Sequence, residues 1–497
     1  MGRRLLAVAL GAAALAGAAW AVPGAITGPS SSQSPYVVRS QPGVVTKSIL
    51  TTGDSVGGYR LVGIPDGLGA FDNGNGTFTL LVNHEIPSSS GIVRAHGGKG
   101  AFVSKWMIEK DDLSVVSGQD LIQQVATWNT ATSAYNAPTT GIVFNRFCSA
   151  TLPDISALYA GNGLGFNGRL FMNGEETTGG RAFAHGLDGT SYELPRLGKL
   201  AFENAVARPG GFAKTVVISQ DDTSGTGGVA NGEVYVYIGT KQSTGSPVEK
   251  AGLTNGDLYG IVVDSSLAED RATGFGAASQ PFSLYPFGNV ENKSGADLQT
   301  ASDGHITKFL RPEDGSWDPN NPAVYYFVTT DRPNSPTQVG RSRLWRLTFS
   351  DVSNPAAGGT IEMLLDGTEG QEMLDNITVN DRGQVLMQED VGENARVGKL
   401  WLYDPPSDAL TEVAAHDPDR FANGGSKFIT EDEESSGIIQ TPFLGEGYYL
   451  FDVQAHSPWS STDGVLPKDF PPYNDPELVE GGQLLALHVP PGKFPKK

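Results

Sequence analysis

Residues 374–390 read LDNITVNDRGQVLMQED, in which an apolar strand, a tight turn and a second apolar strand lead into two adjacent carboxylates. A single ending of this kind ordinarily belongs to a solvated loop. Similar endings recur along the chain, however, and they close on Glu85, Glu176, Asp222, Asp331, Asp390 and His456. Recurrence of one pattern along a chain predicts a repeated structural unit.

A second characteristic strand, with an aromatic or leucine centre, follows most of these endings, at 105–109, 257–263, 343–349, 399–405 and 483–489, with a weaker example at 199–205. Gly 64 and Pro 31 among 497 residues interrupt the chain too often for long helices. The sequence therefore predicts an all-β protein, a six-bladed β-propeller with inserted loops between strands. A β-sandwich is the competing fold, but it gives no reason for acidic residues to recur at one strand end.

The N-terminus, MGRRLLAVALGAAALAGAAWAVPG, has two arginines, an apolar run and a small-residue cleavage pattern. We expect a signal peptide at 1–21, an N-terminal extension at 22–45 and a single propeller domain at 46–497. No segment reaches the roughly 20 apolar residues of a convincing membrane span. The expected protein is a periplasmic or secreted monomer, with the general and the twin-arginine export routes both open.

The charge balance, Lys+Arg 35 against Asp+Glu 55, gives a net charge of −20. Such a chain repels nucleic acid and anionic membranes and favours cations. In a propeller, equivalent strand ends gather at one mouth of the central channel, where converging carboxylates repel one another unless cations lie among them. The repeated acidic endings therefore predict a metal site.

Two short stretches add candidates to the strand endings. Cys148 is the only cysteine, so it cannot form a disulfide within the chain and is either an inert buried thiol or a metal ligand. Glu175 and Glu176 point to opposite faces if their strand continues, so that one binds metal while the other braces a neighbouring blade.

Two further stretches are charged. Arg311, in DGHITKFLRPEDGSWDP, has the guanidinium geometry to take a phosphate oxygen bidentately, although a charged surface loop is the plainer interpretation. In TEDEESSGII we assign only Glu434 to a site. The chain contains no HExxH, Walker phosphate loop, EF-hand loop, CxxC or Gly-x-Ser-x-Gly elbow, which leaves metal chemistry based on carboxylates.

Several of these residues together carry a family resemblance: NHE at 83–85, Cys148 followed downstream by two glutamates, FLRPEDG at 309–315, DN at 375–376 and VQAH at 453–456. The sequence resembles the PhoX-type alkaline phosphatases, exported bacterial enzymes on a six-bladed propeller whose channel holds iron and calcium ions. The resemblance implies that Cys148 is a thiolate ligand of iron, that Arg311 contacts phosphate, and that channel carboxylates binding iron or calcium include Glu176, Glu313 and Glu434. The family's Gly-Gly-x-Thr-Pro-Trp-Gly run after the cysteine is absent, which indicates a divergent branch and favours calcium over iron.

The function expected from the sequence is hydrolysis of a small-molecule phosphomonoester by a metal-dependent phosphatase, with Arg311 and Glu313 as catalytic residues. Calcium is the expected cofactor, joined by iron if Cys148 is a ligand. The expected metal ligands are Glu85, Cys148, Glu175, Glu176, Asp222, Glu313, Asp331, Asp375, Asp390, Glu434 and His456. A calcium-dependent lactonase or esterase, and a non-catalytic extracellular propeller stabilised by calcium, are the alternatives.

Overall fold

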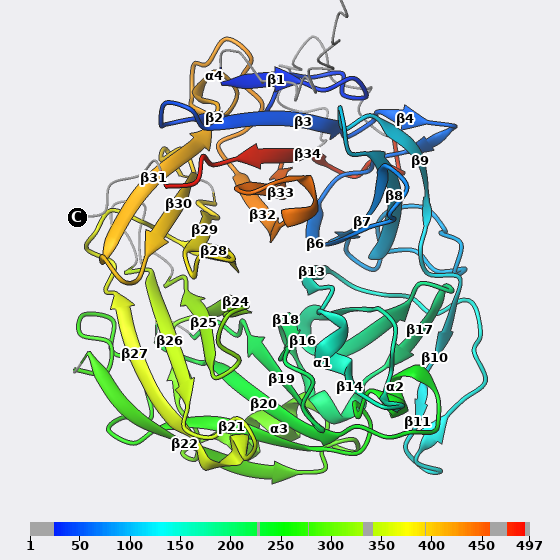
Figure 1. Ribbon diagram of the computed structural model, residues 1–497, viewed down its shortest axis with the longest axis vertical. Helices are drawn as coiled ribbons and strands as arrows, with labels where there is room; N and C mark the ends of the chain where they lie inside the picture. Colours follow the sequence, from blue (N-terminus) through cyan, green and yellow to red (C-terminus); the bar gives the residue numbers. More distant parts are fainter. Residues whose placement is uncertain are drawn as a thin grey trace, which may run out of the picture.

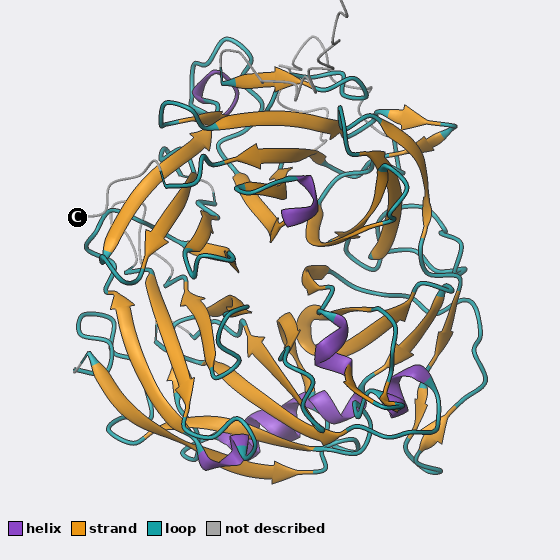
Figure 2. Cartoon of the chain, viewed as in Figure 1, coloured by secondary structure: helices purple, strands orange, loops and turns teal. Residues whose placement is uncertain are grey.

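The structure is a computed structural model that describes residues 24–225, 229–276, 278–331, 341–392, 394–457 and 475–492. The signal peptide predicted at 1–21 lies outside these residues. Strands dominate the fold, as Figure 2 shows. The described α-helices are short, and none is long and apolar enough to cross a membrane: α1 (Ile155–Leu158), α2 (Pro247–Lys250), α3 (Gly295–Ser302) and α4 (Pro418–Phe421).

The strands form sets in which neighbours pair antiparallel, each set starting at its innermost strand. The first contains β6 (Pro65–Asp72), β7 (Thr77–His84), β8 (Phe102–Glu109) and β9 (Val115–Asp120). The next contains β13 (Phe147–Thr151), β16 (Leu170–Gly186) and β17 (Thr190–Glu193), with β10 (Gln124–Ala126) parallel to β17. It is followed by β18 (Lys199–Ala207), β19 (Lys214–Asp221), β20 (Gly232–Thr240) and β21 (Asp257–Val263).

Three more sets complete the described sheets. One contains β24 (Pro312–Trp317), β25 (Val324–Thr329), β26 (Arg343–Phe349) and β27 (Gly359–Leu365). Another contains β28 (Leu374–Val379), β29 (Val385–Glu389), β30 (Lys399–Asp404) and β31 (Ala409–His416). The last contains β32 (Glu433–Gln440), β33 (Tyr448–Ala455), β34 (Gly481–His488) and β3 (Val45–Thr51). Some strands also pair between sets. β16 pairs with β18, and β22 (Ser279–Gly288) pairs with both β21 and β27. These pairs join three of the sets into one continuous sheet.

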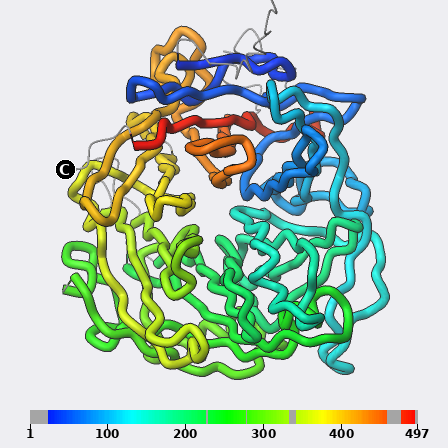
Figure 3. Tube along the Cα trace, in the orientation of Figure 1, coloured from blue at the N-terminus to red at the C-terminus, as the bar shows by residue number. Residues whose placement is uncertain are grey.

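The first strands of the sets surround a central region, and the remaining strands extend outward from it (Figure 1). Each of these inner strands contacts the next in the cyclic order β6, β13, β18, β24, β28 and β32, and β32 contacts β6. The trace in Figure 3 shows the same ring, in which the blue and red ends of the chain lie side by side. The architecture is therefore propeller-like and mostly β, as the sequence predicts.

The two ends of the chain meet within one sheet, because β3 pairs with β34. The segment before residue 46 also takes part in the sheets. Its strand β1 (Ala25–Thr27) lies parallel to β3, and β2 (Val37–Arg39) pairs antiparallel with β31. The segment expected to be an extension therefore contributes outer strands to two sets.

Apolar side chains from adjacent sets pack against one another. Leu386 of β29 shares a fully buried cluster with Val453 and Leu485 of the last set, for example. Phe147 of β13 likewise packs with Leu81 of β7. Such burial stabilises a fold by about 25 cal/mol for each Å² of apolar surface removed from water. Because every set is covered on both sides by its neighbours, the apolar positions are distributed over both faces of the strands.

One irregularity recurs between the first and second strands of each set. The ladder shifts register just after the start of the inner strand, between Pro65 and Leu68, Phe147 and Ala150, Phe202 and Ala205, Pro312 and Gly315, Leu374 and Ile377, and Ser436 and Ile439. A bulge of this kind releases residues from the ladder and redirects their side chains. The released residues lie at the start of the inner strands, where the candidate site is found.

Candidate metal centre

Several ligand candidates are the first residue that a bulge releases from the ladder. This position holds a carboxylate or thiol in all sets but the last: Asp66, Cys148, Glu203, Glu313 and Asp375. All of these side chains are buried. They form two compact groups of potential ligand atoms, each within 4.8 Å of one another: Asp66 with Glu85 and Cys148, and Glu203 with Glu313 and Asp375.

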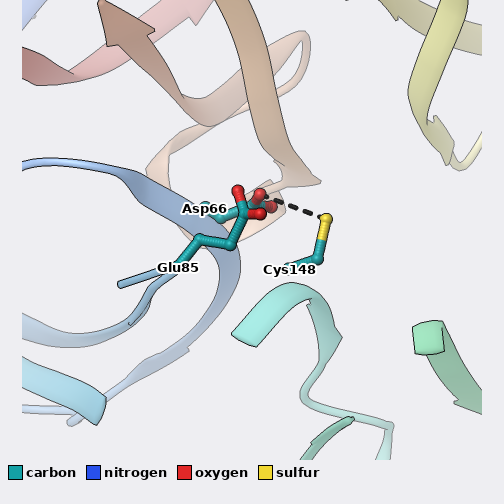
Figure 4. Close-up of side chains that lie close together, drawn as sticks. All are labelled: Asp66, Glu85 and Cys148. Atoms are coloured by element: carbon teal, nitrogen blue, oxygen red, sulfur yellow. Dashed lines mark hydrogen bonds between the residues drawn. The ribbon is translucent and has the colours of Figure 1, made fainter. Parts of the chain in front are cut away.

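The first group combines a thiol with two carboxylates (Figure 4). Glu85 follows directly after β7, whereas Asp66 and Cys148 come from the inner strands β6 and β13. The Sγ atom of Cys148 lies 3.4 Å from Oδ2 of Asp66 and 3.1 Å from Oε2 of Glu203. Cys148 therefore connects the first group to the second.

The second group consists of oxygen donors alone, from β18, β24 and β28. The Ser149 hydroxyl donates to Oε1 of Glu203 at 2.6 Å, and the Asn376 amide donates to the Ser149 hydroxyl at 2.7 Å and to Asp375 at 2.9 Å. Asn376 and Ser149 lie on inner strands that are not neighbours in the ring, so their hydrogen bond crosses the channel. Farther along the inner strands, a separate cavity of about 250 Å³ is lined by residues that include Asn204 and Asp314.

The carboxyl groups of both clusters share an unfavourable environment. Burial is the main cause that raises the pKa of Asp66, Glu203 and Asp375 well above their usual range, and the negative charge of neighbouring carboxylates raises them further. Burial also raises the pKa of Glu313, although the Arg311 guanidinium opposes this shift. Such groups are stabilised either by protons or by cations among them.

Two arginines lie beside the carboxylates. Arg311 donates through Nε and Nη2 to the two oxygens of Asp222, at 2.8 Å each, and its Nη2 is 2.8 Å from Oε1 of Glu313. Arg146 forms ion pairs with Glu85 and with Glu176. Both arginines have left-handed backbone conformations, with φ of 56° and 45°, and each precedes the bulge ligand of its strand by two residues.

The last set contributes a connected polar network. The Gln454 amide donates to Asp66 at 2.9 Å, to Glu85 at 3.0 Å and to Glu434 at 3.3 Å. His456 lies 2.7 Å from Glu480 and 3.5 Å from Glu434. Burial alone would lower the pKa of His456, but the hydrogen bonds to these two glutamates raise it well above its usual value. Asp390 joins this side of the site through a backbone bridge to Glu434.

The structure brings the sequence-predicted residues together except for two. Glu175 forms an ion pair with Arg181 of its own strand β16, at 2.7 Å, so this contact does not brace a neighbouring set. Asp331 forms an ion pair with Arg271, at 2.9 Å, and accepts from the backbone of Arg341. The predicted endings also lie on the second strand of each set or just after it, rather than on the inner strand.

Asp66 and Glu203 are the ligand candidates that the sequence analysis did not identify. Both occur as single acidic residues without an acidic strand ending, in PDG and FEN. A shared local pattern could have found them, because each bulge ligand follows a proline or large apolar residue and precedes a small or polar one. The five examples are PDG at 65–67, FCS at 147–149, FEN at 202–204, PED at 312–314 and LDN at 374–376.

No protein-family model matches the chain, and no curated protein sequence matches it. Among solved structures, the chain is similar to Pseudomonas fluorescens PhoX in complex with vanadate, a transition state analogue, with a TM-score of 0.63 and 11% identity over 90% of this chain and 95% of that one. A protein of unknown function from Dyadobacter fermentans gives a TM-score of 0.41 and 10% identity over 90% of this chain and 100% of that one. The likeness to the PhoX structure is a distant similarity of fold.

Proposed function

We propose that the protein is a divergent PhoX-type enzyme, an exported metal-dependent phosphatase that hydrolyses phosphomonoesters at the mouth of a six-bladed propeller. In this proposal each set of strands is one blade. The observation that carries it is the position of Cys148 between two groups of buried carboxylates, with Arg311 at their edge. The distant fold similarity to PhoX supports the proposal.

The donor atoms fit two kinds of metal ion. A thiol beside carboxylates suits iron, because sulfur ligands favour transition metals over calcium. The Glu203–Glu313–Asp375 group offers only hard oxygen donors, which suit calcium. When bound, such ions supply positive charge that polarises a phosphoryl group.

The chain's own residues would orient the substrate. Asp222 and Glu313 hold the Arg311 guanidinium through Nε and Nη2, and its Nη1 has no acceptor among the described residues. This fixed Nη1 is suited to donate to a phosphate oxygen. Burial around the site excludes water from these charged groups and strengthens their interaction with an anion.

Substitution of Arg311 tests the proposal against the alternatives. Arg311→Lys keeps the positive charge but removes the fork that Asp222 holds, and we expect it to lower turnover of p-nitrophenyl phosphate by about 10²- to 10³-fold with metal content retained. Arg346→Lys is the matched control, because Arg346 pairs with Glu362 on β27, outside the group. Parent protein that binds metal but hydrolyses a lactone and no phosphomonoester would favour the esterase alternative. Metal-loaded parent protein without either activity would favour the non-catalytic propeller.

A further inference from the structure

A cavity of about 370 Å³ lies beside the candidate metal centre. Its walls come from the bulge of β16 at Thr178 and Gly179, the start of β18, the end of β19 and the start of β20, and helix α3 forms the remaining side. This helix contacts β16 and β18, and a capping box between Ser294 and Asp297 fixes its first turn. The volume is in the range of pockets that bind small molecules.

The cavity and the metal centre share a wall at Ala201 of β18. The Ala201 N–H donates to Oδ1 of Asp221 at 3.2 Å, and the Ala201 carbonyl accepts from the N–H of Asp222 at 3.0 Å. Asp221 lines the cavity, whereas Asp222 holds the Arg311 guanidinium. Consecutive Cα atoms are about 3.8 Å apart, so the cavity begins one residue away from the carboxylate that positions Arg311.

Three side chains that line the cavity have unused hydrogen-bonding capacity. Asp221 is buried and accepts from the main chain of Ala201 and the hydroxyl of Thr223, but both bonds go to Oδ1, and its Oδ2 has no partner among the described residues. The buried Nε2 of Gln299 has no acceptor in the same part of the chain. The side-chain amide of Asn231 likewise makes no hydrogen bond to a described residue. The cavity thus offers a carboxylate oxygen as acceptor and two amides that can donate.

Apolar side chains form the rest of the wall. Leu200 and Leu298 belong to the core cluster between the second and third sets and also line the cavity. The hydroxyl of Tyr235 donates to Glu233, which leaves its ring as the part available to the cavity. An apolar surface beside a few polar groups suits a ring that has C–H faces and hydroxyl groups at its edge. The carboxylate of Asp221 disfavours an anionic group in the same place.

We propose that this cavity holds the leaving group of the substrate and that this group is a sugar, so that the substrate is a sugar phosphate. The inference rests on the proposed phosphatase function. Sugar hydroxyls would donate to Oδ2 of Asp221 and accept from Gln299 and Asn231, while the phosphate contacts Arg311. In hydrolysis the oxygen of a water molecule bonds to phosphorus as the P–O bond to the sugar breaks, and a proton passes to the sugar oxygen. Contacts to the sugar, remote from the reacting bond, would then contribute to kcat/KM.

The first test compares glucose 6-phosphate with methyl phosphate, whose leaving group is too small to fill the cavity. Release of inorganic phosphate by metal-loaded protein gives kcat/KM for each ester. We expect the parent protein to prefer glucose 6-phosphate by about tenfold or more, because the methyl ester lacks the hydroxyls that the cavity would bind. Phosphoethanolamine is the third substrate, since a cationic leaving group could also pair with Asp221. A preference for phosphoethanolamine over glucose 6-phosphate would overturn the assignment to a sugar.

Two variants on α3 test the cavity itself. Ala296 is exposed and lines the cavity, so Ala296→Phe would fill the space, and Gln299→Met removes the unpaired amide at similar size. We expect each to lower the ratio of kcat/KM for glucose 6-phosphate to that for methyl phosphate by about tenfold. Ala356→Phe is the matched control, because Ala356 is exposed on the short 3-10 helix Pro355–Ala357 and does not line the cavity.

The outcomes separate this inference from the proposed function. Phosphatase activity with an unchanged ratio in both α3 variants would overturn the sugar site alone. A parent protein that hydrolyses glucose 6-phosphate no better than methyl phosphate would do the same. Metal-loaded parent protein that hydrolyses none of the three esters would overturn the phosphatase proposal, and the sugar site with it.

Discussion

The thiol of Cys148 on β13 lies 3.1 Å from Oε2 of Glu203 on β18, so one side chain connects the two carboxylate groups. If Cys148 ligates iron, Cys148→Ser should abolish the sulfur-to-iron charge-transfer absorption and the activity together. Visible absorption spectra and metal analysis of both proteins test this. Ser149→Ala is a suitable control, because it removes the neighbouring hydroxyl that donates to Glu203 but leaves the thiol. A Cys148→Ser protein with full iron and an unaltered spectrum would exclude the thiol as a ligand.

Removal of metal should destabilise the fold. Without cations, the carboxylates of the two groups face one another in a buried site, where salt screens them poorly. Ligand binding at 1,000 times its Kd stabilises a native state by about 4 kcal/mol, so a strong chelator should lower the melting temperature by several degrees. Differential scanning calorimetry with and without chelator measures this effect. Superimposable melting curves would count against a metal centre.

Acid should destabilise the protein partly through buried His185, whose Nε2 lies 2.9 Å from Oδ1 of Asn173. Burial lowers the pKa of His185 to about 3, below its ordinary value near 6.5. Between these values the unfolded chain binds a proton that the folded chain does not, so stability falls as pH decreases from about 6.5, by about 1.4 kcal/mol per pH unit. His185→Gln retains an amide donor for Asn173 but removes the imidazole that binds a proton in the unfolded chain. Denaturant titrations from pH 6.5 to 4.5 should show a shallower loss of stability in the variant, and parallel curves would contradict the prediction.

Strand β3 should be essential to the last set. It is the partner of β34, and its side chains Ile49 and Leu50 are buried in an apolar cluster with Leu484. A chain that begins after Thr51 would expose both this cluster and the edge of β34, and we expect it to aggregate. A chain that begins at Gln33 lacks β1 but keeps the buried Tyr36 and β3, and it should remain folded. Size-exclusion chromatography and circular dichroism distinguish the two; a monomeric, folded shorter chain would contradict the prediction.

The recurring acidic endings were sufficient to predict a propeller-like, mostly β fold and the region of the candidate site. They were informative because hydrophobic spacing fixes where a strand ends, and the ends of equivalent strands meet in a ring. Glu85, Asp222 and Asp390 are examples whose proximity to the site follows from this logic.

The remaining ligand candidates depend on bulges, which the sequence does not reveal by periodicity. Asp66 and Glu203 reach the channel because the ladder is interrupted beside them, and a regular strand would direct these side chains by alternation alone. Asp331, by contrast, is a candidate that the sequence predicts but the structure places outside the two groups. It has the same strand ending as the other candidates, but Arg271 from a distant loop pairs with it, and such a long-range contact has no local signal.

The pairing of β3 with β34 also determines when the candidate site can form during synthesis. Asp66 and Glu85 are made early, whereas Gln454, which donates to both in the folded chain, and its partner Glu434 are made near the end. A nascent chain that has only reached Asp375 possesses the ligand atoms of both groups but not the closed ring that holds them together. If the two groups bind metal as proposed, complete loading would therefore follow synthesis of the C-terminal strands.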